Sequence, residues 1–490
     1  MKFRIIVSFL AALGFTVPTP AAEDEVQQLK DQLQQLRAAF EKTRREQEQQ
    51  IDALTRKLDA LTPKPPATAA SPAAADAQKK LEQELAAELA GPPAPPRPMN
   101  AERSAPPPVA TARAGTAYMN LSYGTLIDAG WSSVPNPSAQ LELGDHDPIK
   151  RGFSLRNAEL AIDGAIDPYF KGAANIVLKL DENNETAIEL EESYLETTSL
   201  PANLQFKAGQ YFTNFGRQNP QHPHAWAFVD QPLILNRVFG PDGLRSIGAQ
   251  LSWLAPTPFY SELFLSVLDG QGGTAFSFRN PGEPDEAGVA RHVGRATVDR
   301  GLRGAQDLVF VPRLATSFDL SDTQTLLMGV SGAFGPNDTG PRTRTEIYGT
   351  DLFWKWKPAD AARGFPYVSW QTEALYRRFN AGADPLAPAP LRAENLHDYG
   401  LYSQLVWGFV DRWNLGLRAD YVTGNHATFD ASDPFRGRRY RFSPEITFFP
   451  SEFSKVRLQY NFDHGEAFGS AHSIWMQLEF GLGAHAAHKY

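Results

Sequence analysis

Charged side chains recur at every second position of several segments near the end of this chain. In the segment 411–423, Asn414, Arg418 and Asp420 alternate with apolar residues. A β-strand places successive side chains on opposite faces, so this spacing collects the charges on one face and the apolar groups on the other. Charges of both signs on one face perform no covalent chemistry, but they set the electric field along a water-filled passage. The spacing therefore predicts a polar, field-setting face and no catalytic centre.

The same alternation assigns seven basic side chains to this polar face. These pore-lining candidates are Lys171, Lys179, Lys207, Arg377, Arg418, Arg441 and Arg457. Acidic groups such as Glu373, Glu445 and Asp463 share the face with them. We expect water to wet a face of this kind, because an unpaired buried charge is very costly.

A second group of ionisable residues lies in the long segment 214–244 and at the edge of the strand that follows it. The constriction-loop candidates are Arg217, Asp230, Arg237 and Arg245, and the segment also holds His222 and His224. If this loop folds inward, its basic groups would concentrate anions and select for them. The alternative is an external loop packed by its own aromatic and proline residues, and the sequence leaves both open.

The sequence offers little else that could form a reactive site. His485 and His488 near the C-terminus are weak zinc-ligand candidates, since zinc takes three or four ligands. The absence of cysteine excludes thiolate and disulfide chemistry. No Gly-x-Ser-x-Gly spacing marks a serine nucleophile. We therefore expect no enzyme activity and no cofactor.

Sixteen segments of alternating polarity must position these residues. They span 116–127, 153–166, 169–180, 187–198, 204–214, 245–255, 258–268, 309–320, 323–335, 345–357, 367–379, 396–409, 411–423, 439–449, 453–463 and 472–483. Tight turns alternate with longer connections, which is typical of a barrel with short periplasmic turns and long external loops. The predicted fold is an all-β transmembrane barrel of about 16 antiparallel strands. The alternative is a soluble sandwich or propeller, but no blade-length repeat is visible.

The last of these segments carries apolar residues at alternate positions and leads to an aromatic C-terminus. The alternating residues are Ile474, Met476, Leu478, Phe480 and Leu482. This pattern suits a strand with lipid on one side and water on the other. We expect it also to serve as the signal read by the barrel-insertion machinery.

The N-terminal part has a different composition. Residues 1–22 are predicted to be a signal peptide, with Lys2 and Arg4 before an apolar core and a small-residue cleavage site. Residues 23–61 show an a/d seam and are predicted to form a periplasmic α-helical coiled coil, a solvated single helix being the alternative. Residues 62–115 are a Pro/Ala-rich linker with a short helix. Residues 116–490 form the predicted barrel domain.

Three stretches carry a resemblance to a known family. They are Arg156-x-x-x-Leu160-x-x-x-Gly164 within 153–164, then 204–212, and the glycine-rich 240–250. Through them, roughly residues 116–483 resemble the phosphate-selective porin O/P family. The resemblance implies a trimer of sixteen-stranded barrels with an inward third loop. The lumen's mixed charges depart from the dense basic ladder of selective members. The tail is also similar to proteins labelled zinc-regulated outer-membrane receptors.

Together these observations predict a bacterial outer-membrane porin, a passive diffusion channel for small hydrophilic solutes. A preference for anions is expected if the loop 214–244 folds inward. The expected partners are outer-membrane lipid, two further copies of the chain and the insertion machinery. The net charge of −9 argues against nucleic acid. The alternative is a metal (zinc)-linked or substrate-specific outer-membrane uptake protein. A further possibility is an envelope tether anchored by the barrel.

Overall fold

The computed structural model describes residues 112–114, 117–165, 167–198, 200–285, 288–387, 389–425 and 433–483. All of them belong to one compact unit, Ala105–Tyr490. The expected signal peptide (1–22), the coiled coil (23–61) and nearly all of the linker (62–115) lie outside the described residues. His485 and His488 lie outside them as well.

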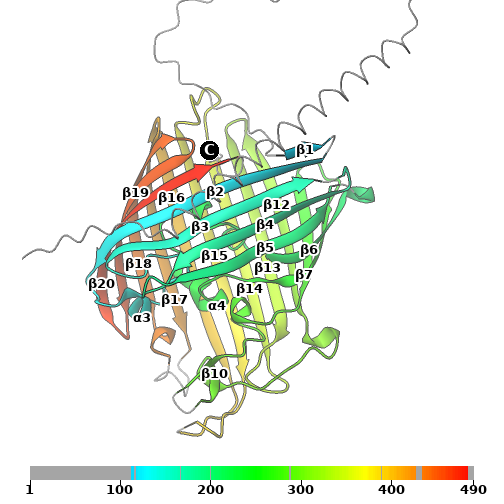
Figure 1. Cartoon of the computed structure of the whole chain (residues 1–490), viewed down its shortest axis with the longest axis vertical. Coiled ribbons are helices and arrows are strands. Elements are labelled where there is room, and N and C mark those ends of the chain that lie inside the picture. The colour runs from blue at the N-terminus through cyan, green and yellow to red at the C-terminus, as the bar shows by residue number, and fades with distance from the viewer. Residues whose placement is uncertain are drawn as a thin grey trace, which may run out of the picture. The chain divides into compact units, whose positions relative to one another are not determined.

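Sixteen antiparallel strands close into a barrel (Figure 1), and the short β1 (Ala112–Ala114) adds to β2 to make a sheet of 17. The barrel strands are β2 (Ala117–Ser132), β3 (Gly152–Ala165), β4 (Phe170–Leu180), β5 (Thr186–Thr197), β6 (Leu204–Phe212), β7 (Arg245–Leu254), β8 (Tyr260–Leu268), β12 (Val309–Ser321), β13 (Gln324–Pro336), β14 (Arg344–Trp356), β15 (Tyr367–Ala381), β16 (Glu394–Val410), β17 (Trp413–Gly424), β18 (Arg439–Ser451), β19 (Ser454–Gly465) and β20 (Gly469–Leu482). Each corresponds to one of the sixteen predicted segments, so the predicted barrel of about 16 strands is confirmed.

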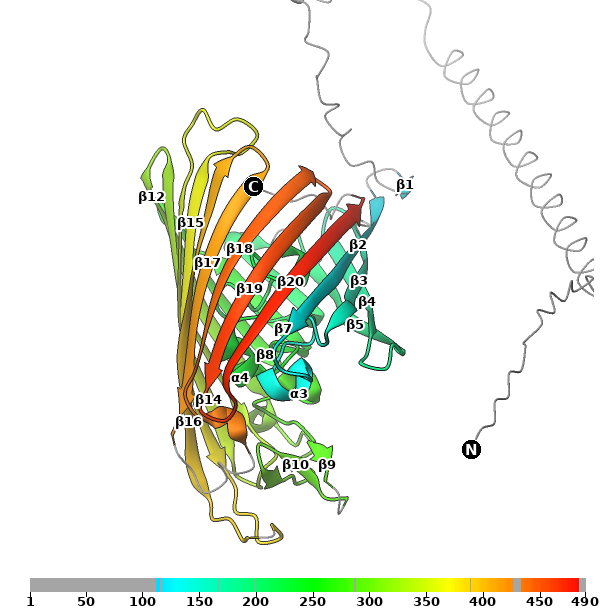
Figure 2. The ribbon, with the colours of Figure 1, turned by 90° about the vertical axis from the view of Figure 1, so that its left-hand side faces the viewer.

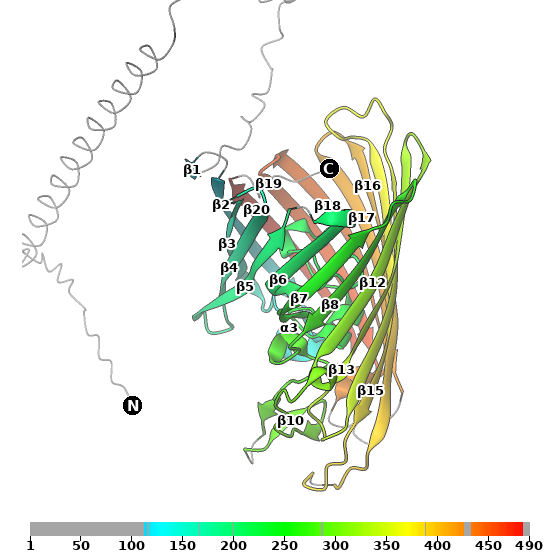
Figure 3. The ribbon, with the colours of Figure 1, turned by 90° about the vertical axis from the view of Figure 1, so that its right-hand side faces the viewer.

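The ring closes where the first long strand meets the last. The pairing of β20 with β2 runs from the pair Tyr123–Leu482 to the pair Ser132–Ser473. On its other side, β2 pairs with β3. Figure 2 shows β18, β19, β20 and β2 side by side, and Figure 3 shows the wall from β6 to β12. Each barrel strand therefore has a paired neighbour on both sides, as a membrane requires of the backbone, although β5 and β6 pair only from Ser193 and Gln210 to Glu196 and Lys207.

Side chains alternate between the two faces as the sequence predicts. On β17, Leu417 points outward and is 48% exposed, whereas the neighbouring Arg418 points inward and is 1% exposed. The apolar series on β20, from Ile474 to Leu482, is likewise exposed on the outer face. An outer wall of exposed leucine, phenylalanine and tryptophan side chains would be unfavourable in water and is suited to lipid.

The two ends of the barrel differ. One end carries the chain's short turns, such as the one in which Asp167 accepts hydrogen bonds from the backbone of Tyr169 and Phe170. The other end carries the long loops with their short elements: α3 (Pro137–Leu141), α4 (Leu233–Phe239), η2 (Pro223–Ala225), η3 (Gly273–Ala275), η4 (Ala305–Asp307), η6 (Pro434–Arg436) and the sheet of β9 (Glu283–Pro284), β10 (Ala290–His292) and β11 (Arg295–Ala296). η1 (Pro201–Asn203) lies in a short turn. Within the described part of the chain, no helix is both long and apolar enough to cross a membrane.

Two irregularities interrupt the regular pairing near the loop end. Arg156 of β3 is skipped where Leu126 and Ile127 pair with Asn157 and Leu155. Glu191 of β5 is skipped in the same way between Leu190 and Glu192. Such β-bulges re-aim side chains. Here Arg156 and Asn157 are both buried on the inner side, and so is Glu191 beside Glu192.

Candidate functional site

The loop that joins β6 to β7, residues 213–244, folds into the barrel. Its helix α4 has all seven residues buried and packs against β15, β16 and β17 (Figures 1 and 2). The helix ends at Gly240, whose φ of 79° favours glycine and whose added Cβ would lie 2.7 Å from Phe276 Cβ. Of the two arrangements that the sequence left open, the structure therefore shows the inward one.

Apolar side chains of this loop pack into a core inside the barrel. Phe215, Leu233, Val238 and Phe239 are all buried in one cluster with residues from the barrel wall. The wall residues of the cluster include Tyr211, Leu268, Val309, Ile347, Leu375 and Tyr402. The lumen is thus packed, not water-filled, on the side where α4 lies.

Asp230 fastens the loop to the opposite polar wall. Its carboxylate accepts hydrogen bonds from Arg418, Arg441, Gln459 and Asn461, each at 2.7 Å. These four donors come from three adjacent strands, β17, β18 and β19. Burial raises the pKa of Asp230, but Arg418 and Arg441 outweigh burial and lower that pKa to about 2. Asp230 is therefore an ionised anchor.

α4 is fastened by a second charge network. Arg237 donates to Asp398 at 3.1 Å and pairs with Glu142 at 3.2 Å and with Asp433. Asp398 also accepts from Arg377, at 2.6 Å. Because these groups compensate one another while buried, the network fixes the helix rather than offering free charge to a solute.

The seven pore-lining candidates fall into two groups. Lys171 and Lys207 both pair with Glu196 and retain some exposure, and Lys179 pairs with Glu189 at 2.7 Å. The other four are almost completely buried: Arg377, Arg418, Arg441 and Arg457. For these four the expected water-wetted wall is wrong. The loop covers them, and carboxylates or backbone carbonyls pair with them, which is how buried charge is tolerated.

The four constriction-loop candidates also differ from one another. Asp230 and Arg237 are the anchors described above, and Arg245 is buried against Glu189. Arg217 is half-buried, and its guanidinium lies 3.8 Å from the ring centre of Phe353 on β14. Among the residues that the structure describes, the Arg217 guanidinium forms no ion pair. Arg217 alone of the four therefore has no salt-bridge partner, although Glu373 and Asp351 lie within electrostatic range of it.

A cluster of histidines and carboxylates lies where the loop meets β3 and β5. The Nδ1 atom of His222 lies 3.0 Å from Glu191 and 3.6 Å from Glu159, while its Nε2 lies 2.9 Å from Glu192. His224 stacks on His222 and contacts Glu159 at 3.2 Å. Burial lowers the pKa of His222, but the facing carboxylates outweigh burial and raise that pKa well above its ordinary value. The imidazole nitrogens and carboxylate oxygens of this cluster are donor types that bind metal ions.

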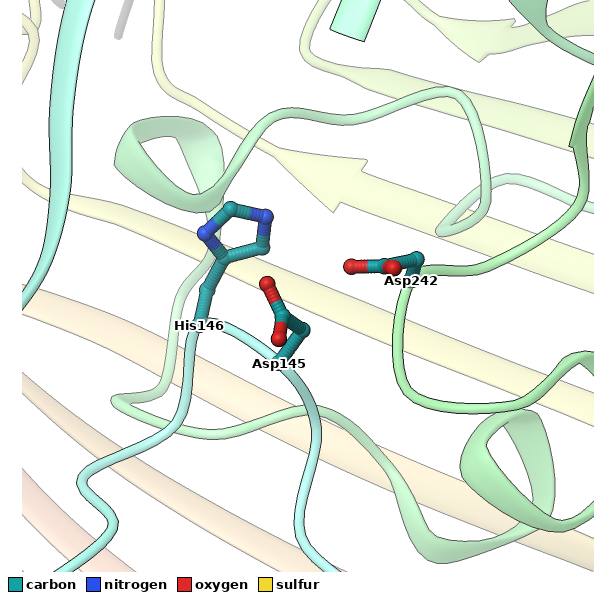
Figure 4. Close-up of side chains that lie close together, drawn as sticks. All are labelled: Asp145, His146 and Asp242. Carbon is teal, nitrogen blue, oxygen red and sulfur yellow. The ribbon is translucent and has the colours of Figure 1, made fainter. Parts of the chain in front are cut away.

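A neighbouring group consists of Asp145, His146 and Asp242 (Figure 4). His146 Nδ1 lies 3.1 Å from the backbone oxygen of Arg156, and its Nε2 lies 2.9 Å from Glu191. Burial lowers the pKa of His146, but Glu191 outweighs burial and raises it to about 9. Glu191 thus joins this group to the His222 cluster.

Sequence reasoning missed the acidic members of this site. Glu159 lies within the family-like stretch 153–164, on the polar face of its strand, so alternation could have found it. Glu191 could not be found in this way, because the bulge that turns it inward breaks the alternation of β5. His222 and His224 were noted only as loop residues, and nothing in their spacing shows which strands they meet.

These features define the class of the protein: a sixteen-stranded membrane-type β-barrel whose third loop at the loop end folds into the lumen. A protein of Aquifex aeolicus (strain VF5), described only as an uncharacterized protein, is 32% identical over 364 residues, which cover 70% of this chain and 71% of that protein. The chain belongs to the same family as this Aquifex protein. No family model matches the chain.

Several solved outer-membrane proteins overlap with the barrel. The outer membrane channel DcaP of Acinetobacter baumannii covers 76% of this chain and 100% of its own, with 12% identity and a TM-score of 0.49. The match to OmpF of Salmonella typhi covers 75% of this chain and 98% of the OmpF chain, with 11% identity and a TM-score of 0.43. The match to OprB of Pseudomonas putida covers 75% of this chain and 94% of the OprB chain, with 11% identity and a TM-score of 0.40. These scores are low, so the description of the barrel rests on its own strand pairing.

Proposed function

We propose that the protein is a porin of the bacterial outer membrane, through which small hydrophilic solutes diffuse passively. The observation that carries this proposal is the closed barrel with an apolar outer wall, a charged inner wall and an inward loop. A wall of this kind needs lipid outside, and a partly filled lumen lets size and charge decide which solutes pass. The proposal needs neither a cofactor nor a reaction.

We further propose a preference for anions, which rests on Arg217 and Lys355. Lys355 lies on β14 within electrostatic range of Arg217 and of Lys357. In the described part of the chain neither Arg217 nor Lys355 forms an ion pair, in contrast to the buried arginines of the wall. Cations without a salt-bridge partner beside a constriction raise the local concentration of anions. Phosphate selectivity of the O/P type has only the sequence resemblance as its support.

Targeting and assembly complete the proposal. The predicted signal peptide 1–22 would direct export, and the coiled coil 23–61 would lie in the periplasm and join three copies. The linker 62–115 would connect it to the barrel domain 116–490. The alternating apolar residues of β20 are the expected contact for the insertion machinery. Support for these points comes from the sequence patterns.

A second candidate is a metal-linked uptake protein. The observation in its favour is the cluster of Glu159, Glu191 and His222 in the lumen. The tail histidines His485 and His488, proposed as weak metal ligands, are its other support.

Planar-bilayer recordings of the refolded chain in a chloride gradient test the porin proposal. We expect steps in groups of three and a reversal potential that shows anions permeating faster than cations. In the double variant Arg217→Gln, Lys355→Gln the anion-to-cation ratio should fall toward one. The matched control Arg392→Gln removes an exposed external charge and should leave the ratio unchanged. A barrel that inserts but conducts nothing would refute the proposal.

A further inference from the structure

Two carboxylates and one imidazole from three separate parts of the chain converge inside the barrel. Glu159 comes from β3, Glu191 from the bulge of β5, and His222 from the inward loop. Their exposed fractions are 3%, 0% and 9%. One atom from each lies within 4.8 Å of the other two. A cluster this deeply buried requires compensation for its charge.

The hydrogen bonds of the described residues do not supply that compensation in full. One oxygen of Glu159, both oxygens of Glu191 and Nδ1 of His222 are buried without a hydrogen bond of acceptable geometry. Nδ1 of His222 lies 3.0 Å from Glu191 and 3.6 Å from Glu159, so these contacts are ion pairs. One ligand atom from each of the three residues therefore lies in the same small volume.

The other nitrogen of His222 is already occupied. Nε2 lies 2.9 Å from Glu192, and the amide of Asn175 lies 3.0 Å from the same atom. Because the facing carboxylates favour the protonated ring, a metal ion would displace the Nδ1 proton. With Nε2–H directed at Glu192, the ring would then present Nδ1 as a ligand in a fixed orientation. Metal-binding histidines are commonly oriented in this way.

The separations also suit a small divalent ion. Zinc–nitrogen bonds of about 2.0–2.1 Å and zinc–oxygen bonds of about 2.0–2.2 Å place tetrahedral ligand atoms about 3.3–3.5 Å apart. The 3.0 and 3.6 Å separations of Nδ1 from the two carboxylates bracket that value, and the carboxylates lie within 4.8 Å of each other. Two carboxylates would neutralise a 2+ ion. We propose that Glu159, Glu191 and Nδ1 of His222 bind a divalent transition-metal ion of the zinc type.

The neighbouring group in Figure 4 is less suitable. Asp145 already pairs with Arg156 at 2.9 Å and with Lys179, so its charge is compensated. His146 has one nitrogen facing a backbone carbonyl. This group supports the site from outside, because His146 holds the second oxygen of Glu191 at 2.9 Å.

Metal binding at this position would fasten the loop to β3 and β5, whereas Asp230 fastens it to β17, β18 and β19. A small cavity lined by Ser122, Glu159 and His224 adjoins the site. The inference concerns binding and does not depend on whether the barrel conducts.

Isothermal titration of the refolded, metal-free full chain with Zn²⁺ tests the proposal. We expect one ion per chain with a Kd at or below the micromolar range. The variant Glu159→Gln, His222→Gln should bind at least 100-fold more weakly. His464→Gln, at an outward-facing strand position, and the tail variant His485→Ala, His488→Ala should each bind as the native chain does.

A loss of heat-modifiable electrophoretic migration would show that the double variant does not fold. The single variant His222→Gln then replaces it, because this substitution lies in the loop and changes no strand residue. A native chain that binds no Zn²⁺ overturns the proposal and leaves an ion-pair network. A folded variant that binds as tightly as the native chain overturns it too. Binding lost only in the tail variant would assign the metal to His485 and His488.

Discussion

The charge anchor at Asp230 yields a quantitative prediction about the position of the inward loop. The substitution Asp230→Ala removes the acceptor for Arg418 and Arg441, which donate to it at 2.7 Å. The barrel strands remain intact, because their backbone ladder does not involve Asp230. The loop should then leave its docked position more often while the barrel stays folded.

The size of this effect follows from the contacts that are lost. A hydrogen bond to a charged group contributes about 1.5–3 kcal/mol. Arg418 keeps Asp420 at 2.8 Å and Arg441 keeps Asp463 at 2.7 Å, so neither arginine becomes an unpaired buried charge. Counting only these two bonds, each at the lower bound, gives about 3 kcal/mol, and the lost bonds of Gln459 and Asn461 to Asp230 make this a minimum. Since about 1.4 kcal/mol is a factor of ten, the undocked population should rise about 100-fold.

Thiol labelling measures this population directly, because the chain has no cysteine of its own. Val229, next to the anchor, is 2% exposed, so the substitution Val229→Cys places a single thiol that a water-soluble maleimide reaches only when the loop undocks. Labelling should be about 100-fold faster with Asp230→Ala than without it. Asp322→Ala, at an exposed turn, is the matched control. A change below about threefold in a folded barrel would refute the anchoring role of Asp230.

Three further predictions concern the loop end, the helix terminus and the outer wall. Burial lowers the pKa of His292 to about 4, so the docked state of its loop segment is fully stabilised above pH 6.5 and loses up to about 3 kcal/mol as the pH falls toward 4. Amide hydrogen exchange of residues 289–298, corrected for intrinsic rates, should therefore be faster in acid. An unchanged rate would contradict this expectation. Gly240→Ala should cost about 1–3 kcal/mol of unfolding free energy in a urea titration because of its positive φ and the contact with Phe276, whereas Gly273→Ala, in open space, should cost much less. Leu417→Arg should lower the free energy of unfolding in lipid vesicles by about 2–4 kcal/mol, and Leu320→Arg, next to a short turn, by about 0–1 kcal/mol; equal costs would argue against a lipid-facing wall at mid-strand.

The strands of this barrel could be predicted from the sequence because their signal is local. In a strand with lipid on one side and polar groups on the other, apolar and polar residues alternate along the sequence, as they do in β17 and β20. That pattern also places Arg418 and Arg441 correctly on the inner face. It does not depend on knowing which strands are neighbours.

The site depends on long-range pairing, which alternation does not contain. The sequence marks Asp230 as a constriction-loop candidate, but it does not show that Asp230 meets β17, β18 and β19. Because this docking supplies the carboxylate, the sequence could not show that the wall arginines are buried and paired. Glu191 needs a bulge whose position is set by the register of β4 against β5. The donors for the inferred metal therefore become visible only in three dimensions.

The pairing of β20 with β2 has a consequence for the order of assembly. Tyr123 pairs with Leu482, which lies 359 positions later (482 minus 123), so the ring cannot close until the final segment of the chain is present. Until then β2 and the most recently added strand both present unpaired backbone edges, which are templates for pairing with other chains. A chain truncated before β20 would retain those edges instead of forming a smaller barrel. The barrel can therefore close only when β20 is present, because β20 is the strand that pairs with the free edge of β2.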